Sequence, residues 1–218
     1  MITRFKICCI GSVEEAQLAV SSGAAAVGLV GRMPSGPGPI PDDLIRKIAI
    51  TVPPPVATFL LTSETSVIKI IQHHQRVNTN TIQIVDSLSD GTYMQLKESL
   101  PNVKIVQVIH VIDEKSVDEA VRISQMTDAL LLDSGNPGLK IKELGGTGRV
   151  HDWRLSRKIT EKSECPVFLA GGLNPDNVQR AIEEVAPFAV DICSGVRTGG
   201  KLDREKLERF VNNIMKTF

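Results

Sequence analysis

Short apolar runs alternate with longer segments of helical periodicity along the whole chain. The apolar runs are rich in β-branched residues and predict strands over residues 4–9, 25–30, 55–61, 81–86, 103–109, 128–133, 166–170 and 189–193. The longer segments predict helices over residues 13–22, 41–50, 64–76, 90–99, 114–125, 152–162, 175–185 and 203–216. This alternation is typical of repeated βα units arranged around a parallel sheet.

Several predicted helices begin with residue types that cap a helix N-terminus. Ser12, Asp113 and Asn174 each precede one of them, and Pro175 would take the first helical position after Asn174. Eight βα units predict a (β/α)8 TIM barrel that forms a single domain over residues 1–218. The alternative is an open doubly wound sheet, which usually has fewer strands and an early GxGxxG turn, and this sequence contains no GxGxxG.

The charge balance narrows the class of partner. Lys and Arg total 25, Asp and Glu total 25, and the formal net charge is zero. A nucleic-acid-binding protein would need a basic surface, so we expect no nucleic-acid partner, whereas a small anionic substrate is compatible with this balance. No apolar stretch reaches the roughly 18 residues that span a bilayer, and the N-terminus lacks a signal-peptide pattern. We therefore expect no membrane association and a cytoplasmic location.

The four cysteines are Cys8, Cys9, Cys165 and Cys193. They form no CxxC pair and have no histidine at zinc-finger spacing, so we expect neither a metal site nor a redox dithiol. In the cytoplasm they would be reduced. Cys9, Cys165 and Cys193 are expected to act as small buried apolar side chains.

A barrel places its active site at the carboxyl ends of its strands, and glycine clusters follow the last three predicted strands. They are Gly145-Gly146-Thr147-Gly148, Gly171-Gly172 and Ser194-Gly195. Glycine lets backbone N–H groups approach an anion closely, although each cluster taken alone is equally compatible with a tight turn. Three clusters at consecutive strand ends favour a phosphate site.

Two strand ends carry side chains suited to proton transfer. Asp133 ends the run "DALLLD", where partial burial would raise its pKa and make it a general acid, although aspartate here is also typical of a cap. Cys8 lies on the same strand face as Lys6, whose ammonium would favour the thiolate, although a lone cysteine is more often a buried apolar residue. By the period-two rule Cys8 and Cys9 face opposite sides, so only one would reach the barrel mouth.

The histidines and the tryptophan give weaker signals. His73 and His74 lie in a predicted helix and are expected to be solvated, and His151 and Trp153 lie at a predicted helix start. His110 lies near the end of the predicted strand 103–109 and is expected to be structural unless it points into the barrel mouth.

Five segments occur in an order and spacing far more specific than any one of them. They are "KIC" at 6–8, "LLLDS" at 130–134, "GGTGRVHDW" at 145–153, "FLAGGLNPDNVQRAI" at 168–182 and "VDICSGV" at 190–196. Through these segments the chain resembles the phosphoribosylanthranilate isomerases of tryptophan biosynthesis over nearly its whole length. The resemblance implies a barrel enzyme without a cofactor. Its reaction would be an aldose–ketose isomerisation, an intramolecular oxidoreduction that converts a phosphoribosyl amine to the 1-deoxyribulose 5-phosphate derivative of anthranilate.

The resemblance also implies roles for individual residues. Asp133 would be the general acid that protonates the furanose ring oxygen, and Cys8 would be the general base that removes the C2′ proton from the resulting Schiff base. The phosphosugar substrate would place its phosphate on Gly146, Gly148, Gly172 and Gly195. Contacts to the rest of the substrate would come from Lys6, Arg32 and Gln83. Both a monomer and a homodimer are compatible with the sequence.

Several positions depart from the pattern of the family. Cys9 stands where the family usually has glycine, which tolerates backbone angles that cysteine does not. The loop "GRMPSGPGPIP" at 31–41 lacks a Ser-Pro-Arg motif whose arginine faces the anthranilate carboxylate, and Arg32 is the candidate replacement. "QIVD" keeps Gln83 but loses a His-Gly pair, and Arg197 replaces a glutamate.

These departures leave two other functions open. The chain would be a different phosphosugar isomerase, epimerase or aldolase if the loop 31–41 reshapes the acceptor pocket. It would be a non-catalytic binder of a phosphorylated ligand if only the phosphate site is retained. Both alternatives keep the barrel, so activity and substitutions at Cys8 and Asp133 separate the three.

Overall fold

The computed structural model describes residues 3–136, 138–139, 141–145 and 148–217. The barrel strands are β1 (Arg4–Ile7), β2 (Ala26–Val30), β3 (Ala57–Thr62), β4 (Thr81–Ile84), β5 (Lys104–His110), β6 (Ala129–Asp133), β7 (Val167–Leu169) and β8 (Ala189–Ile192). The α-helices are α1 (Val13–Ser21), α2 (Asp42–Thr51), α3 (Val67–Val77), α4 (Tyr93–Ser99), α5 (Glu114–Ser124), α6 (Trp153–Lys162), α7 (Val178–Val185) and α8 (Arg204–Met215). A 3-10 helix η1 (Ser194–Val196) and the short strands β9 (Arg197–Thr198) and β10 (Lys201–Leu202) lie between β8 and α8.

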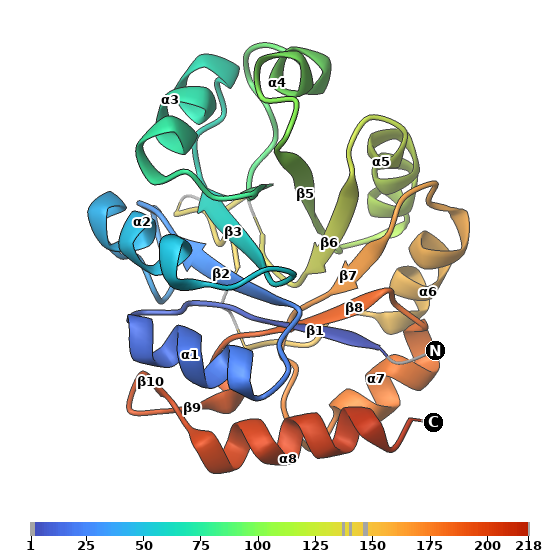
Figure 1. Ribbon diagram of the computed structural model, residues 1–218. Coiled ribbons are helices and arrows are strands. Elements are labelled where there is room, and N and C mark those ends of the chain that lie inside the picture. The colour runs from blue at the N-terminus through green and yellow to red at the C-terminus, as the bar shows by residue number, and fades with distance from the viewer. Residues whose placement is uncertain (1–2, 137, 140, 146–147, 218) are drawn as a thin grey trace.

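Strands β1 to β8 pair in parallel in sequence order and close into a barrel. β1 pairs with β8, with Ile7 opposite Ile192, so the ring closes between the two ends of the chain. The helices surround the strands (Figure 1). The predicted (β/α)8 barrel is therefore confirmed, and the open doubly wound sheet is excluded. Among the described residues, no helix is long and apolar enough to cross a membrane.

Element boundaries differ from the predicted ranges by up to three residues at helix starts. The largest consequence is at α7, which was predicted to start at Pro175 and starts at Val178. Asn174 does not cap this helix, because its Oδ1 accepts hydrogen bonds from the backbone N–H groups of Asp176 and Asn177 and forms a separate turn first.

Two apolar layers hold the barrel together. Outward-facing strand residues such as Leu60, Ile82 and Leu130 are fully buried between the strands and the helices. Inside the barrel, the rings of Phe59 and Phe168 meet edge-on with centroids 5.8 Å apart. Burying apolar surface at about 25 cal/mol per Å² is the main force that stabilises both layers. Polar side chains enter the interior toward the carboxyl ends of the strands, where the candidate site lies.

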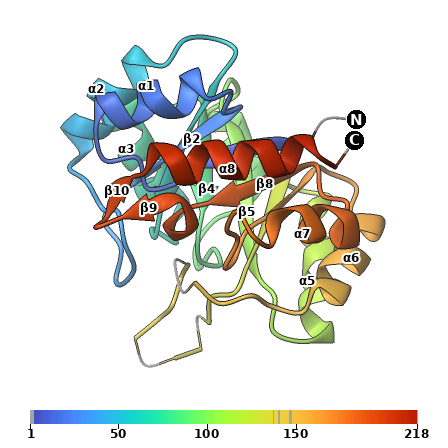
Figure 2. The same ribbon diagram turned by 90° about the horizontal axis from the view of Figure 1, so that it is seen from below.

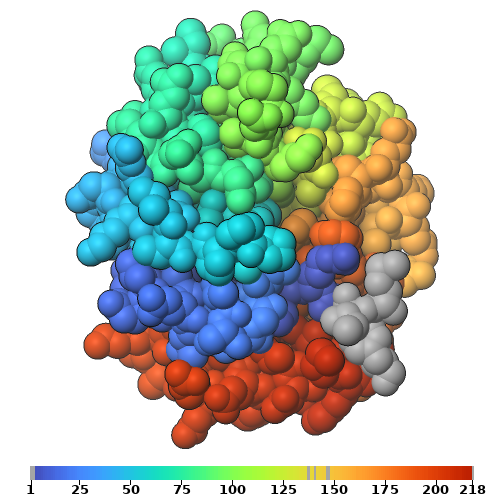
Figure 3. Space-filling view, in the orientation of Figure 1, coloured from blue at the N-terminus to red at the C-terminus, as the bar shows by residue number. Residues whose placement is uncertain are grey.

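The C-terminal segment packs against the first strand. Thr198 of β9 pairs with Lys201 of β10, and α8 places Phe210 edge-on against Phe5 with ring centroids 6.3 Å apart. Figure 2 shows β9 and β10 beside the start of α8. In Figure 3 the first residues (dark blue) lie against the last segments (orange to red). The hairpin was not predicted, because two-residue strands leave no periodic signal.

His73 and His74 on α3 are buried, which contradicts the prediction that they are solvated. They are 4% and 5% exposed. His73 Nδ1 lies 2.9 Å from Thr62 Oγ1 and its Nε2 lies 3.2 Å from Asp42 Oδ1, while His74 Nε2 lies 2.6 Å from the Thr79 carbonyl oxygen. These hydrogen bonds make burial of the rings acceptable. Burial lowers the pKa of His73, so the ring is held neutral.

We expect His73→Ala to lower the free energy of unfolding by about 1–3 kcal/mol, because it removes the hydrogen bonds to Thr62 and Asp42 and leaves space beside Gly31. Urea denaturation measures this change. The control is Ile68→Ala on the same helix, whose side chain is 63% exposed and which should change the value by less than about 0.5 kcal/mol. Equal losses in the two variants would contradict the role of the buried ring.

Candidate active site

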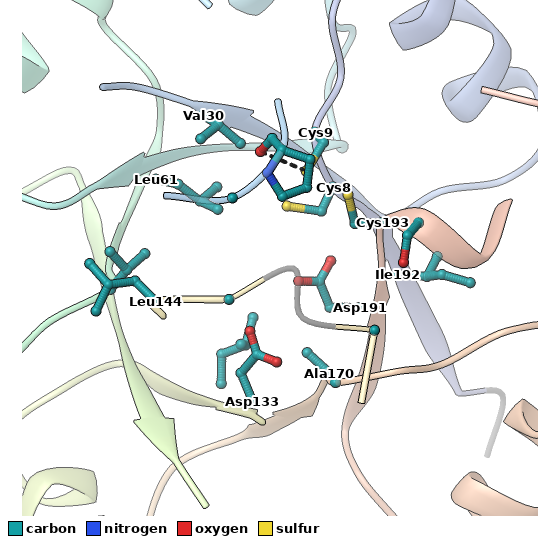
Figure 4. Close-up of a pocket in the computed structure, with 18 of the residues that line it drawn as sticks. Cys8, Cys9, Val30, Leu61, Asp133, Leu144, Ala170, Asp191, Ile192 and Cys193 are labelled. Carbon is teal, nitrogen blue, oxygen red and sulfur yellow. Dashed lines mark hydrogen bonds between the residues drawn. The ribbon is translucent and has the colours of Figure 1, made fainter. Parts of the chain in front are cut away.

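A cavity opens at the carboxyl ends of the barrel strands. Its polar lining includes Cys8, Gln83, Asp133 and Asp191, which come from four different strand ends. In the view of Figure 4, Asp133 lies across the cavity from Cys8, and Asp191 lies between them. The structure thus brings the two predicted catalytic side chains to one cavity.

Cys8 and Cys9 both line this cavity, so the prediction that they face opposite sides is wrong. β1 ends at Ile7, and Cys9 adopts a φ of +60°, in the left-handed region. Because the chain no longer alternates as a strand there, the period-two rule fails. Cys9 takes a backbone angle that favours glycine. Its side chain fits because Gly38 has no side chain, since a Cβ at that position would lie only 2.6 Å from the Cys9 Cβ.

A buried ion pair lies behind the cavity. Lys6 is fully buried, and its Nζ lies 2.8 Å from Asp191 Oδ2. Gly28 leaves space for this ammonium, because a Cβ on Gly28 would lie only 3.1 Å from Nζ. Burial alone would lower the pKa of Lys6, but the attraction of Asp191 and the neighbouring thiols outweighs it and raises the pKa. Lys6 therefore stays charged. Lys6 was predicted to contact the substrate; it does not line the cavity, and its ammonium binds Asp191, which does.

Two buried oxygens of the cavity have no hydrogen-bond partner among the described residues. They are Asp191 Oδ1 and Gln83 Oε1. Buried polar atoms are nearly always paired in proteins, so a hydroxyl or N–H of a ligand is their natural partner. The sequence predicts Gln83 as a site residue but does not single out Asp191, whose only signal is a charged residue inside the apolar run 189–193.

Asp133 is the last residue of β6 and is 8% exposed. Burial raises the pKa of its carboxyl group. Two smaller effects lower this pKa: a hydrogen bond of 2.7 Å from the Ser134 N–H to Oδ1, and the nearby His110. A raised pKa suits a general acid. His110 pairs with Asp133 in the strand register, but its Nε2 lies 3.0 Å from the Val85 carbonyl oxygen and it does not line the cavity.

Cys193, just after β8, brings a third thiol to the cavity. Cys9 Sγ donates to the Pro37 carbonyl oxygen at 3.6 Å. The neighbouring Cys9 lowers the pKa of Cys193, while Cys193, Cys8 and burial raise the pKa of Cys9. Cys9 is therefore held as a thiol.

The glycine loops after β6, β7 and β8 approach one another closely. Gly148 and Gly172 line the cavity, and a Cβ on Gly172, whose φ is +64°, would lie 2.6 Å from the backbone of Arg149. Gly195 lies in η1 outside the lining, where a Cβ would lie 2.2 Å from the Leu173 carbonyl oxygen. Gly146 lies outside the described residues. Only glycine allows these loops to meet so closely. The glycine loops after β6, β7 and β8 therefore lie together at one side of the barrel mouth.

The loop 31–41 contacts the segment after β6 over the cavity. Ser35 Oγ donates to the Lys142 carbonyl oxygen at 2.6 Å, and the Lys142 ammonium binds the carboxylate of Asp86. Arg32 is exposed and does not line the cavity, so the structure shows no contact for its predicted role.

The closed parallel barrel, with a carboxyl group of raised pKa and a thiol on one cavity at the strand ends, is the arrangement of an acid–base enzyme of the TIM-barrel class. The family model for N-(5′-phosphoribosyl)anthranilate (PRA) isomerase matches residues 5–213. The chain belongs to this family.

Two relatives match the sequence of this chain over almost their full length. The N-(5′-phosphoribosyl)anthranilate isomerase of Methanosarcina acetivorans is 36% identical over 99% of this chain and 94% of its own. That of Haloarcula marismortui is 35% identical over 97% of this chain and 96% of its own.

Solved structures agree with the fold. The phosphoribosyl anthranilate isomerase of Thermotoga maritima superposes with a TM-score of 0.80 at 30% identity, over 98% of this chain and 99% of that one. A phosphoribosyl anthranilate isomerase solved with reduced 1-(o-carboxyphenylamino)-1-deoxyribulose 5-phosphate superposes with a TM-score of 0.77 at 28% identity, with the same coverage.

We expect Lys6→Met to lower the free energy of unfolding by about 3–5 kcal/mol, because it leaves Asp191 buried without its partner. Thermal and urea denaturation measure the loss, and the double variant Lys6→Met/Asp191→Leu should recover most of it. The control is Lys104→Met, whose exposed pair with Asp128 should contribute less than about 1 kcal/mol. A single variant as stable as the wild type would show that the pair does not hold its charge in the barrel.

Proposed function

We propose that this protein isomerises N-(5′-phosphoribosyl)anthranilate to 1-(o-carboxyphenylamino)-1-deoxyribulose 5-phosphate. The observation that carries the proposal is the placement of Asp133 and Cys8 on opposite sides of one cavity, in a chain of this family. The reaction needs one proton donor at the ring oxygen and one acceptor at C2′, and these two side chains supply them.

The first step opens the sugar ring. Asp133 gives its proton to the furanose ring oxygen while the bond from that oxygen to C1′ breaks, and the nitrogen lone pair forms the C1′=N bond of a protonated Schiff base. Burial raises the pKa of Asp133, so a larger fraction of the enzyme carries the proton that this step needs.

The second step moves a proton from carbon. The Cys8 thiolate takes the C2′ proton, and the electrons of that bond form C1′=C2′ as the nitrogen becomes neutral. The resulting enolamine then loses the proton of its C2′ hydroxyl and gains one at C1′, which gives the ketose. Exchange of protons with water then returns Asp133 and Cys8 to their starting protonation states. The unpartnered oxygens of Asp191 and Gln83 are suited to hold the sugar hydroxyls during this transfer.

The phosphate end of the substrate has its natural location at the three glycine loops. Gly148 and Gly172 face the cavity, and Gly195 joins the loop after β8 to the loop after β7. Backbone N–H groups at glycines can approach phosphate oxygens without obstruction by a side chain. For the aromatic ring, Met33, Leu61 and Leu144 supply apolar surface elsewhere in the lining of the cavity.

We expect Cys8→Ala and Asp133→Asn each to reduce kcat by about 10²–10⁴-fold, because each removes one of the two proton transfers. The assay follows the loss of fluorescence of freshly generated phosphoribosylanthranilate. The control is Arg32→Ala, which should leave kcat and KM unchanged because that side chain is exposed outside the cavity.

A folded wild-type protein that does not turn over this substrate but binds another phosphosugar would contradict the proposal. Turnover of that sugar would indicate a different isomerase, epimerase or aldolase. Binding without any turnover would indicate a phosphate-ligand binder.

The pH profile depends on the burial of Asp133. Because the acid must be protonated, kcat should fall as pH rises through the raised pKa of Asp133. Leu144→Ala removes a buried apolar side chain from the cavity that Asp133 lines, so we expect it to admit water, lower the pKa of Asp133 and move this falling limb to lower pH. The control is Leu139→Ala, in the same segment but 45% exposed, which should leave the limb in place. A shift to higher pH in Leu144→Ala would disprove the assignment of the limb to Asp133.

A further inference from the structure

Arg197 is a buried cation that connects the end of β8 to the end of β1. Its side chain is 9% exposed, although it follows directly after the glycine loop at the barrel mouth. It does not line the cavity. A buried guanidinium needs strong partners to offset the loss of water, so its contacts show what it holds.

One nitrogen of Arg197 binds two successive backbone carbonyls. Nη2 donates to the Cys8 carbonyl oxygen at 3.1 Å and to the Cys9 carbonyl oxygen at 2.6 Å. These carbonyls belong to the two peptide planes on either side of the Cys9 Cα. Their relative orientation is set by the φ and ψ angles of Cys9, so a group that grips both planes fixes those angles.

Cys9 needs such a restraint. Its φ of +60° lies in the left-handed region, where a residue other than glycine carries about 1–3 kcal/mol of strain. Without the restraint, the backbone would relax toward negative φ. Such a change would rotate the peptide plane between Cys8 and Cys9 and redirect the neighbouring Cys8 side chain.

Glu15 in the first turn of α1 holds the guanidinium in place. Arg197 Nη1 lies 3.0 Å from Glu15 Oε1, and the carboxylate also accepts from the N–H groups of Gly11 at 2.9 Å and Leu202 at 2.8 Å. Burial opposes ionisation of Glu15, but these hydrogen bonds, the one from Arg197 first, outweigh it and lower its pKa. The guanidinium is thus locked by a charged partner, which makes its hold on Cys8 and Cys9 rigid.

We propose that Arg197 is a positioning residue that holds the strained Cys9 backbone and so directs the Cys8 thiol into the cavity. The proposal rests on the proposed function of Cys8 as the base. Arg197 acts through the Cys8–Cys9 peptide and does not touch the substrate.

The test is a double-variant cycle between Arg197→Gln and Cys9→Gly. Glycine adopts a φ of +60° without strain, so Cys9→Gly removes the need for the restraint. We expect Arg197→Gln to reduce kcat for phosphoribosylanthranilate by about 10–100-fold with little change in KM, since small misplacement of a catalytic group has effects of this size. Cys9→Gly alone should stay near the wild type, and the double variant should recover most of the lost kcat.

Arg154→Gln is the matched control, because that arginine is 89% exposed, and it should leave kcat unchanged. A role in stability alone would lower Tm in Arg197→Gln and leave kcat of the folded enzyme intact. A contact with the substrate phosphate would raise KM and leave kcat intact. Loss of kcat that Cys9→Gly does not restore would show that backbone strain is not the route. Each of these three results would overturn the proposal.

A second readout separates this proposal from the proposed function. Iodoacetamide alkylation of Cys8, followed by mass spectrometry of the unliganded protein, needs no substrate. We expect slower alkylation of Cys8 in Arg197→Gln and recovery in the double variant. If the wild type is inactive but alkylation follows this pattern, the proposed function fails and the positioning role stands. Unchanged alkylation together with an active wild type would overturn the positioning role alone.

Discussion

The pairing of β1 with β8 is the constraint on which the rest of the site depends. It joins the two ends of the chain in register, with Lys6 opposite Asp191 and Ile7 opposite Ile192. The buried ion pair, the approach of Cys193 to Cys9 and the reach of Arg197 to the Cys8 and Cys9 carbonyls all cross this one seam. A barrel that did not close here would leave Lys6 and Asp191 as isolated buried charges, which proteins do not tolerate.

The ion pair has a second effect on the cavity. Lys6 neutralises one oxygen of Asp191 from behind, while Oδ1 faces the cavity without a partner among the described residues. Asp133 lies in the same cavity, and burial disfavours its charged form. Burial raises the pKa of both carboxyl groups, but at Asp191 the ammonium of Lys6 opposes this shift through its charge and hydrogen bond, whereas Asp133 has no such ion pair among the described residues. Their different surroundings separate a hydrogen-bond acceptor from a proton donor.

The positions that the sequence analysis expects to depart from the family pattern lie close to one another in space. Cys9 fits because Gly38 in the loop 31–41 has no side chain, and Arg197, another of these positions, donates a hydrogen bond to the Cys9 carbonyl oxygen. Asp86, in the altered "QIVD" segment, binds Lys142, whose carbonyl oxygen accepts from Ser35 of the same loop. The altered positions therefore make contacts that compensate one another, and the acid, the base and the cavity keep their places.

The sequence alone predicts the alternation of strands and helices, because apolar periodicity and helix caps are local patterns that do not depend on contacts with distant residues. It also placed Cys8, Gln83 and Asp133 at strand ends, since a barrel brings such ends together whatever the details. Four features appear only in the folded protein: the burial of His73, the partner of Lys6, the left-handed turn at Cys9 and the inward position of Asp191. These features depend on contacts between residues far apart in the chain, and no local pattern records which distant group lies opposite.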